Sequence, residues 1–387
     1  MLVALAVSAC ATRVAPIGTG GQPFTPDADE RLLWAQAERE ATALLKRLRL
    51  YDDPALAAYL AQLGERLTPE AARAAGGPSP SFTVIRDPTL NAFALPDGRV
   101  FIHTGLLAAV ETEAQLALLL AREIAHVAHR DALAASRDGK VAPARYEDAL
   151  PLSPTAAAIL GADAPLARLA AITGYGARAA READAAALAS LVRSGWDARR
   201  ATAVWEVLER ESRERGALET FLLGSSPRLR ARREAMHVLR APSVPAGGFE
   251  TSDDFEMHRL RVSRENALED ARAGRFALAR QQLDRVLAAA PGDATAHVYD
   301  GDLHRLRSQW AASAQERDVE LEAALHAYAR ALALDPTRAD VHRQLGLLHY
   351  QRGDAAEARA EFQEYLRLAP GGADARRLAE YVRELQP

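Results

Sequence analysis

The sequence has almost no cysteine, no excess of one charge and no long apolar run. Its single cysteine, Cys10, excludes an intramolecular disulfide and a cysteine-ligated zinc site. The formal net charge of the 387 residues is only -4, so no nucleic acid is implied as a partner. The apolar N-terminal run, residues 1–9, is too short to span a bilayer. What remains is a globular, helix-favouring composition with 49% hydrophobic residues, and a length that favours two domains.

The N-terminal segment has the pattern of a lipid-attachment signal. Small residues precede the cysteine in Val7-Ser8-Ala9-Cys10, and residues 16–26, rich in Pro, Gly and Thr, follow as a tether. The pattern resembles the lipobox of bacterial lipoprotein signal peptides, in which the cysteine is lipidated and becomes the mature N-terminus. We therefore expect residues 1–26 to be signal and tether, with a membrane as partner through lipidated Cys10. The alternative is a hydrophobic N-terminus with an incidental cysteine.

The stretch from residue 116 to residue 130 predicts an amphipathic helix, because apolar residues recur along it at helical spacing. Zinc peptidases of the zincin type carry H-E-x-x-H on such a helix, where two histidines bind zinc and the glutamate is the general base. Here Arg122 stands in place of the first histidine, and arginine has no lone pair for a metal. The sequence therefore keeps the base, Glu123, and the second ligand, His126, but lacks the first ligand.

The residues before this helix predict two helices and a small sheet. Asp27 or Asp29 and then Asp53-Pro54 are typical of helix starts. Residues 82–85 predict a strand, and residues 91–95 and 100–102 predict a hairpin closed by residues 96–99.

Four segments, in this order and spacing, resemble the HtpX/Ste-type zinc metallopeptidase family, and in particular its BepA-like branch with C-terminal tetratricopeptide repeats. They are Asp52-Asp53-Pro54 with Tyr59, Asn91 to Gly98, Phe101 to Leu107, and Glu123 to Val127. The resemblance implies a mainly α fold, in which an α+β zincin-like domain with a small sheet, residues 27–245, precedes a helical repeat domain. It also implies a strand that offers its edge to an extended polypeptide, formed by Asn91, Ala92, Phe93, Ala94 and Leu95.

The resemblance further implies a third metal ligand, a glutamate in a Glu-x-x-Ala-Asp pattern on a helix over residues 175–184. Ala183 and Asp184 fix the register there, and Ala180 stands where the glutamate is expected. The family's accessory His-Pro dipeptide corresponds to Ser226 and a following proline. With Arg122, three substitutions thus fall on one site. Since a catalytic zinc needs three protein ligands, we expect no cofactor, and we expect Glu123 and His126 to be vestigial.

Two further expectations concern this site without its metal ligands. Glu123 and Asp184 are left as buried acids, which is costly without a partner, so we expect Arg122 to pair with one or both of them. The alternative is that Arg122 extends into solvent. A rebuilt zinc site from His103, His126 and His129 is a second alternative, in which zinc would be bound after all.

Residues 246–387 predict tetratricopeptide repeats. Gly274 to Pro291 and Gly353 to Pro370 both span 17 residues, and Pro336 lies 34 residues before Pro370, the period of this repeat. Pro291 and Pro336 are 45 residues apart, which fits one repeat with an 11-residue insertion over residues 308–318. Such repeats stack into a superhelix with a concave face. That face either binds a polypeptide or clamps the first domain.

The leading interpretation is a bacterial envelope lipoprotein on the periplasmic face of the outer membrane. Its metallopeptidase-like domain has lost zinc and catalysis, and it binds polypeptide clients or envelope proteins through the repeats and the edge strand, in assembly or quality control. One alternative is an active zinc metalloendopeptidase with atypical ligands. Another is a repeat adaptor whose first domain is an inert scaffold.

Overall fold

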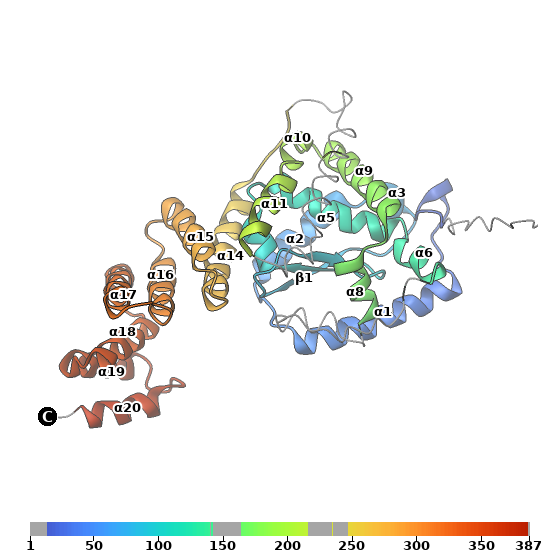
Figure 1. The fold of residues 1–387 in the computed structure, drawn as a ribbon. Helices are drawn as coiled ribbons and strands as arrows, with labels where there is room; N and C mark the ends of the chain where they lie inside the picture. The colour runs from blue at the N-terminus through green and yellow to red at the C-terminus, as the bar shows by residue number, and fades with distance from the viewer. Residues whose placement is uncertain (1–13, 140, 142–163, 216–233, 235–246, 386–387) are drawn as a thin grey trace, which may run out of the picture. The chain divides into compact units, whose positions relative to one another are not determined.

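The computed structural model describes residues 14–139, 141, 164–215, 234 and 247–385 (Figure 1). Cys10 and Ser226 lie outside these residues, as does most of the stretch between residues 138 and 165. The chain divides into two compact units, residues 1–259 and residues 260–387. In the described part of the chain no helix has the length and apolarity needed to cross a membrane.

The first unit is mostly helical around one small sheet. Its elements are η1 (Thr19–Gly21), α1 (Ala28–Arg47), α2 (Pro54–Leu67), α3 (Glu70–Ala74), β1 (Ser81–Ile85), β2 (Ala92–Ala94), β3 (Arg99–His103), α4 (Thr104–Ala109), α5 (Glu113–Ala128), α6 (Asp131–Arg137), α8 (Pro165–Arg168), the π-helical turn η2 (Leu169–Thr173), α9 (Ala177–Arg193), α10 (Ala198–Ala201) and α11 (Val204–Arg215). Helix starts follow the sequence signals. The Asp53 carboxylate accepts the N–H groups of Ala55 and Leu56 at the start of α2, and the Thr112 hydroxyl accepts that of Gln115 at the start of α5.

The sheet has three strands in the order β1-β3-β2. β1 runs parallel to β3, and β2 and β3 form the predicted antiparallel hairpin, with Phe93 opposite Phe101. β2 is therefore an edge strand. Helices α2 and α5 lie on one side of the sheet and α1 on the other (Figure 1). The core between α1 and the sheet contains Leu33, Leu44, Ile85, Phe93 and Phe101.

Helix α5 is the predicted motif helix, but it is buried on nearly all sides. The apolar spacing predicts one buried stripe, whereas 14 of its 16 residues are buried. The reason is that α2, α9, α10 and β2 all pack against it. A polar residue on α5 therefore finds its partner inside the protein.

The second unit consists of paired helices: the later part of α14 (Asp253–Arg272), then α15 (Phe276–Ala289), α16 (Ala294–Ser308), α17 (Ala314–Leu334), α18 (Ala339–Arg352), α19 (Ala355–Leu368) and α20 (Ala375–Glu384). The helix pairs α16/α17 and α18/α19 make the same kind of contact, between a glycine and an aromatic ring. A Cβ on Gly301 would collide with the Tyr328 ring, and one on Gly346 with the Phe362 ring. These partners are 27 and 16 residues apart, so the 11 extra residues lie between Gly301 and Tyr328. Much of the predicted insertion extends α17, which has 21 residues where α15 and α19 have 14.

The predicted fold class, mainly α with a small sheet in the first domain and helical repeats after it, is confirmed.

Candidate functional site

Helices α5 and α9 pack together and bring three predicted site residues into contact. Nε of Arg122 donates to Oδ1 of Asp184 at 3.1 Å, and its Nη1 donates to Oε1 of Glu123 at 2.6 Å. The side chains of Arg122, Glu123 and Asp184 are 18%, 7% and 3% exposed. The expected pairing of Arg122 with one or both acids is confirmed, since Arg122 contacts both, and the alternative that Arg122 extends into solvent is wrong.

The charge of this cluster is set by its burial. Burial opposes a charged guanidinium, but the nearby charges of Glu123 and Asp184 outweigh it and raise the pKa of Arg122. Arg122 is therefore a permanent cation held between two carboxylates. A divalent cation brought to the same carboxylates would meet this charge at close range, where the low dielectric makes repulsion strong.

His126 lies on the same edge of α5 and has a carboxylate partner that the sequence analysis missed. Its Nδ1 is 2.7 Å from Oδ2 of Asp131, the first residue of α6, and both side chains are buried. Burial raises the pKa of Asp131 to about 6. The Tyr175 ring packs on the imidazole, with 5.0 Å between centroids. Proteins orient a metal-binding histidine through a hydrogen bond between one of its ring nitrogens and a carboxylate. Asp131 makes this contact with His126.

The expected third-ligand position has no donor atom. Ala180, on α9, is half-buried. Glu182 points away from the site, because its side chain is 48% exposed and pairs with Arg178 at 3.2 Å. Ser226 lies outside the described residues.

The histidines of the rebuilt-site alternative are not brought together. His103 is buried in another cluster, with its Nδ1 2.5 Å from Oγ1 of Thr89 and 3.4 Å from Oδ1 of Asp87. Burial opposes the charge of Asp87, but its contacts with His103 and Thr89 outweigh burial and lower the pKa of this carboxyl. His129 ends α5. Over the residues that the structure describes, no group of three or more His, Cys, Asp or Glu side chains is placed to hold a metal ion.

The edge strand β2 lies beside this site. Asn91 accepts the His103 N–H and Leu95 donates to Arg99, so alternate residues of the strand bond to β3. Ala92 and Ala94 alternate with them and direct their N–H and C=O groups to the outer edge. No hydrogen bond to these outward groups occurs within the described ranges.

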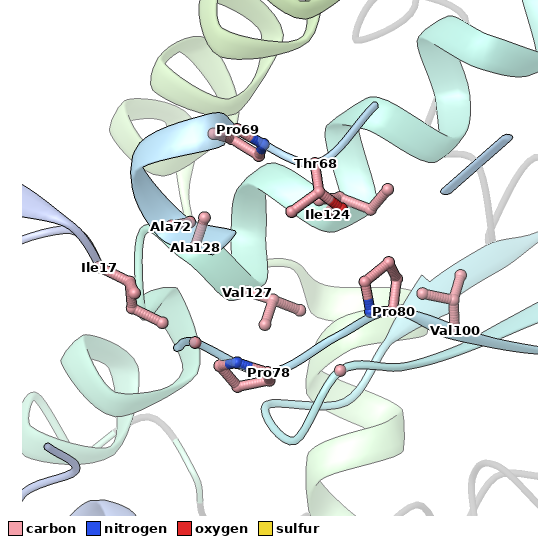
Figure 2. A pocket seen from close by; sticks show the side chains of 12 residues that line it. Ile17, Thr68, Pro69, Ala72, Pro78, Pro80, Val100, Ile124, Val127 and Ala128 are labelled. Carbon is pink, nitrogen blue, oxygen red and sulfur yellow. The ribbon is translucent and has the colours of Figure 1, made fainter. Parts of the chain in front are cut away.

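Two narrow hollows flank α5. One adjoins the site, between the end of the edge strand (Ala94 to Pro96), His126 and Tyr175. The other has mainly apolar walls, from Pro69 and Pro78 to Val100, Ile124 and Val127, and contains none of the predicted site residues (Figure 2).

Comparison with known proteins matches both parts of the chain. Residues 54–240 match the model of peptidase family M48, and residues 311–383 match that of the tetratricopeptide repeat. The putative β-barrel assembly-enhancing protease of Vibrio cholerae serotype O1 is 33% identical over 182 residues, 44% of this chain and 36% of that protein. The β-barrel assembly-enhancing protease of Escherichia coli strain K12 is 32% identical over 160 residues, 38% of this chain and 31% of that protein. The chain thus spans about a third of the length of these two relatives.

A short segment also matches the mitochondrial metalloendopeptidase OMA1 of Schizosaccharomyces pombe. It is 56% identical over 43 residues, which are 11% of this chain and 13% of that protein.

The M48 family normally binds zinc, and the donor set here does not fit that metal. Of the three expected ligand positions, His126 carries a donor atom, while Arg122 and Ala180 supply no lone pair. Glu123 is engaged by Arg122. The chain contains a peptidase family M48 domain followed by tetratricopeptide repeats.

Proposed function

We propose that this protein binds polypeptides in the bacterial envelope, in assembly or quality control, and that its M48 domain has lost zinc and catalysis. The observation that carries the proposal is the contact of Arg122 with Glu123 and Asp184, at 2.6 and 3.1 Å. The guanidinium supplies the positive charge that two buried carboxylates need. The buried carboxylates at the former zinc site are thereby stabilised without a metal.

Zinc binding would have to undo this arrangement. Removing one partner from a buried ion pair typically costs about 3–5 kcal/mol. A zinc ion would then meet His126 and the two freed carboxylates, Glu123 and Asp184, but among the described residues these side chains do not form a group that could hold a metal ion. Without the metal there is no activated water for Glu123 to deprotonate. The chemistry of these residues therefore favours a pseudopeptidase.

The polypeptide-binding role rests on the edge of β2. Ala92 and Ala94 present N–H and C=O groups that an added strand can pair, which is β-augmentation. The helical repeats offer a second surface of a kind that binds extended or helical segments. Neither surface requires a catalytic metal.

The proposed location is supported by the relatives' names. The two bacterial relatives are called β-barrel assembly-enhancing proteases, and barrels of this kind belong to the outer membrane. Lipidation of Cys10 would attach the chain there, on the periplasmic face. The clients proposed are unfolded or partly assembled envelope polypeptides.

An active zinc metalloendopeptidase is the second candidate, because His126 keeps its orienting partner Asp131 at 2.7 Å. Zinc content of the purified full-length chain, after dialysis with a slight zinc excess, separates the two. Near-stoichiometric zinc that disappears in His126→Ala supports the peptidase. A folded chain without zinc supports the proposal.

The third candidate, a repeat adaptor with an inert first domain, is tested at β2. Proline at position 94 removes the outward N–H of Ala94 but no bond to β3. Loss of client binding in Ala94→Pro supports a working edge strand. Unchanged binding supports the adaptor.

A further inference from the structure

The edge strand is covered by another part of the same chain. Residues 164–175, here called the cover segment, comprise α8, η2 and Tyr175. Turn η2 packs against β2, and Leu166, Ala167 and Ala171 share a buried cluster with Phe93 and Leu95. At its end, the Tyr175 ring lies 5.0 Å from that of His126.

A buried carboxylate on α1 holds the cover segment in place. Oε2 of Glu40 accepts the N–H groups of Leu166 at 2.9 Å and Ala167 at 3.0 Å, and Oε1 accepts from Nε2 of Gln36 at 2.9 Å. Glu40 is only 3% exposed. These are charge-assisted bonds in a dry setting, where each contributes more than a neutral surface bond. They fasten the start of the segment at one place.

The outer edge of β2 at Ala94 is buried without hydrogen-bond partners among the residues that the structure describes. Ala94 is 2% exposed, yet its outward N–H and C=O have no hydrogen-bond partner in the described part of the chain. A buried main-chain group without a partner costs roughly 1–3 kcal/mol. Among the described residues, the edge at Ala94 is thus buried beside η2 and α5 without a replacement for its hydrogen bonds. A polypeptide strand on this edge would replace them.

The other end of the cover segment has a backbone conformation that favours glycine. Tyr175 sits between Gly174 and Gly176, which have φ of 66° and 96°. Glycine adopts this region without the strain that a side chain adds. Displacement of the segment requires the backbone to turn near Tyr175, and glycines on both sides of this residue make such a turn less costly than side chains would.

We infer that the cover segment is a built-in competitor for the edge of β2, fastened by Glu40, and that an extended polypeptide binds by displacing it. The inference rests on the proposed function, in which β2 receives a polypeptide strand. It adds that residues 164–175 compete with a bound polypeptide for this strand. The hydrogen bonds of Glu40 to the segment determine how readily it is displaced.

The test compares three variants of the full-length chain on α1. Glu40→Ala removes both acceptors, and Glu40→Gln keeps one acceptor oxygen and should fold even if the alanine variant does not. Glu38→Ala removes an exposed carboxylate from the same helix and is the matched control. Hydrogen exchange reports on the amides of Leu166 and Ala167. The binding probe is a labelled ten-residue peptide of alternating valine and lysine.

We expect Glu40→Ala to speed exchange at Leu166 and Ala167 and to tighten peptide binding about tenfold, the equivalent of one lost charge-assisted bond. Glu40→Gln should lie between it and the wild type, and Glu38→Ala should match the wild type. Ala94→Pro, combined with Glu40→Gln, should abolish binding.

Two outcomes overturn the inference and are distinguishable. Peptide binding that depends on position 94 but is equal in the wild type and both Glu40 variants would mean that the cover segment does not compete. An absence of binding in every variant, with exchange at residues 166 and 167 accelerated, would overturn the use of β2 itself and the inference with it.

Discussion

Arg122 on α5 donates a hydrogen bond to Asp184 on α9 over 3.1 Å, at the position where the resemblance to zinc metallopeptidases predicts the first metal ligand. The same guanidinium holds Glu123 at 2.6 Å. One side chain thus satisfies a carboxylate on its own helix and one on the neighbouring helix. The stability of the domain should depend on this contact.

Replacing Arg122 by alanine should destabilise the protein by about 3–5 kcal/mol, because two buried carboxylates lose their counter-charge. Denaturant unfolding of the first unit measures the loss. Arg178→Ala is the matched control on α9. Its ion pair with Glu182 is exposed, at 52% and 48%, so the change should stay within about 0.5 kcal/mol. Equal, small losses for both variants would contradict a structural role for Arg122.

Restoring the ligands should restore zinc. The double variant Arg122→His/Ala180→Glu supplies the two missing donors to His126, which Asp131 already orients at 2.7 Å. We expect about one zinc per chain by metal analysis, and none when His126→Ala is added. Each single variant should bind far less zinc, since two ligands do not complete a zinc site. A double variant that folds and stays free of zinc would mean that the site has changed beyond its ligands.

Asp131 should make stability depend on pH. Its pKa rises from 3.8 unfolded to about 6 folded, so the folded state holds the proton more tightly. Stability should therefore fall as pH rises from about 4 to about 6, by roughly 2–3 kcal/mol. The difference in unfolding free energy between the wild type and Asp131→Asn, followed from pH 3.5 to pH 7, isolates this effect. A difference that is constant over this range would contradict it.

In the repeats, Gly301→Ala should destabilise the second unit by about 1–3 kcal/mol, because the added methyl group collides with the buried Tyr328 ring. Gly292→Ala is the control, since nothing lies within 4 Å of a Cβ there. Thermal unfolding, followed by circular dichroism, compares the two. If Gly301→Ala behaves like Gly292→Ala, then α16 and α17 are not packed as described.

The contact of Arg122 could be predicted from the sequence. Arg122 and Glu123 are neighbours on the predicted motif helix, and the Ala183-Asp184 register places the second acid on α9. What it does not contain is the partner of His126. Asp131 follows Arg130, a non-glycine residue with φ of 60°, and Tyr175 follows a π-helical turn and lies between two glycines. Such backbone turns decide where these side chains point, and residue spacing does not predict them.

In the fold, too, local features could be predicted from the sequence and contacts between distant segments could not. The capping residues Asp53 and Thr112 and the hairpin around Gly98 mark elements locally, so their positions follow from local chemistry. The burial of α5 on nearly all sides and the bonds from Glu40 to residues 166 and 167 join segments far apart in the chain. They depend on the assembled domain.

The proposed loss of the metal is tested by the zinc content of the purified wild-type chain, dialysed with a slight zinc excess and then against buffer. We expect no bound zinc, and a fold and unfolding midpoint unchanged by chelator. Near-stoichiometric zinc that is lost in His126→Ala would contradict it and would make this chain a metallopeptidase with an unforeseen set of ligands.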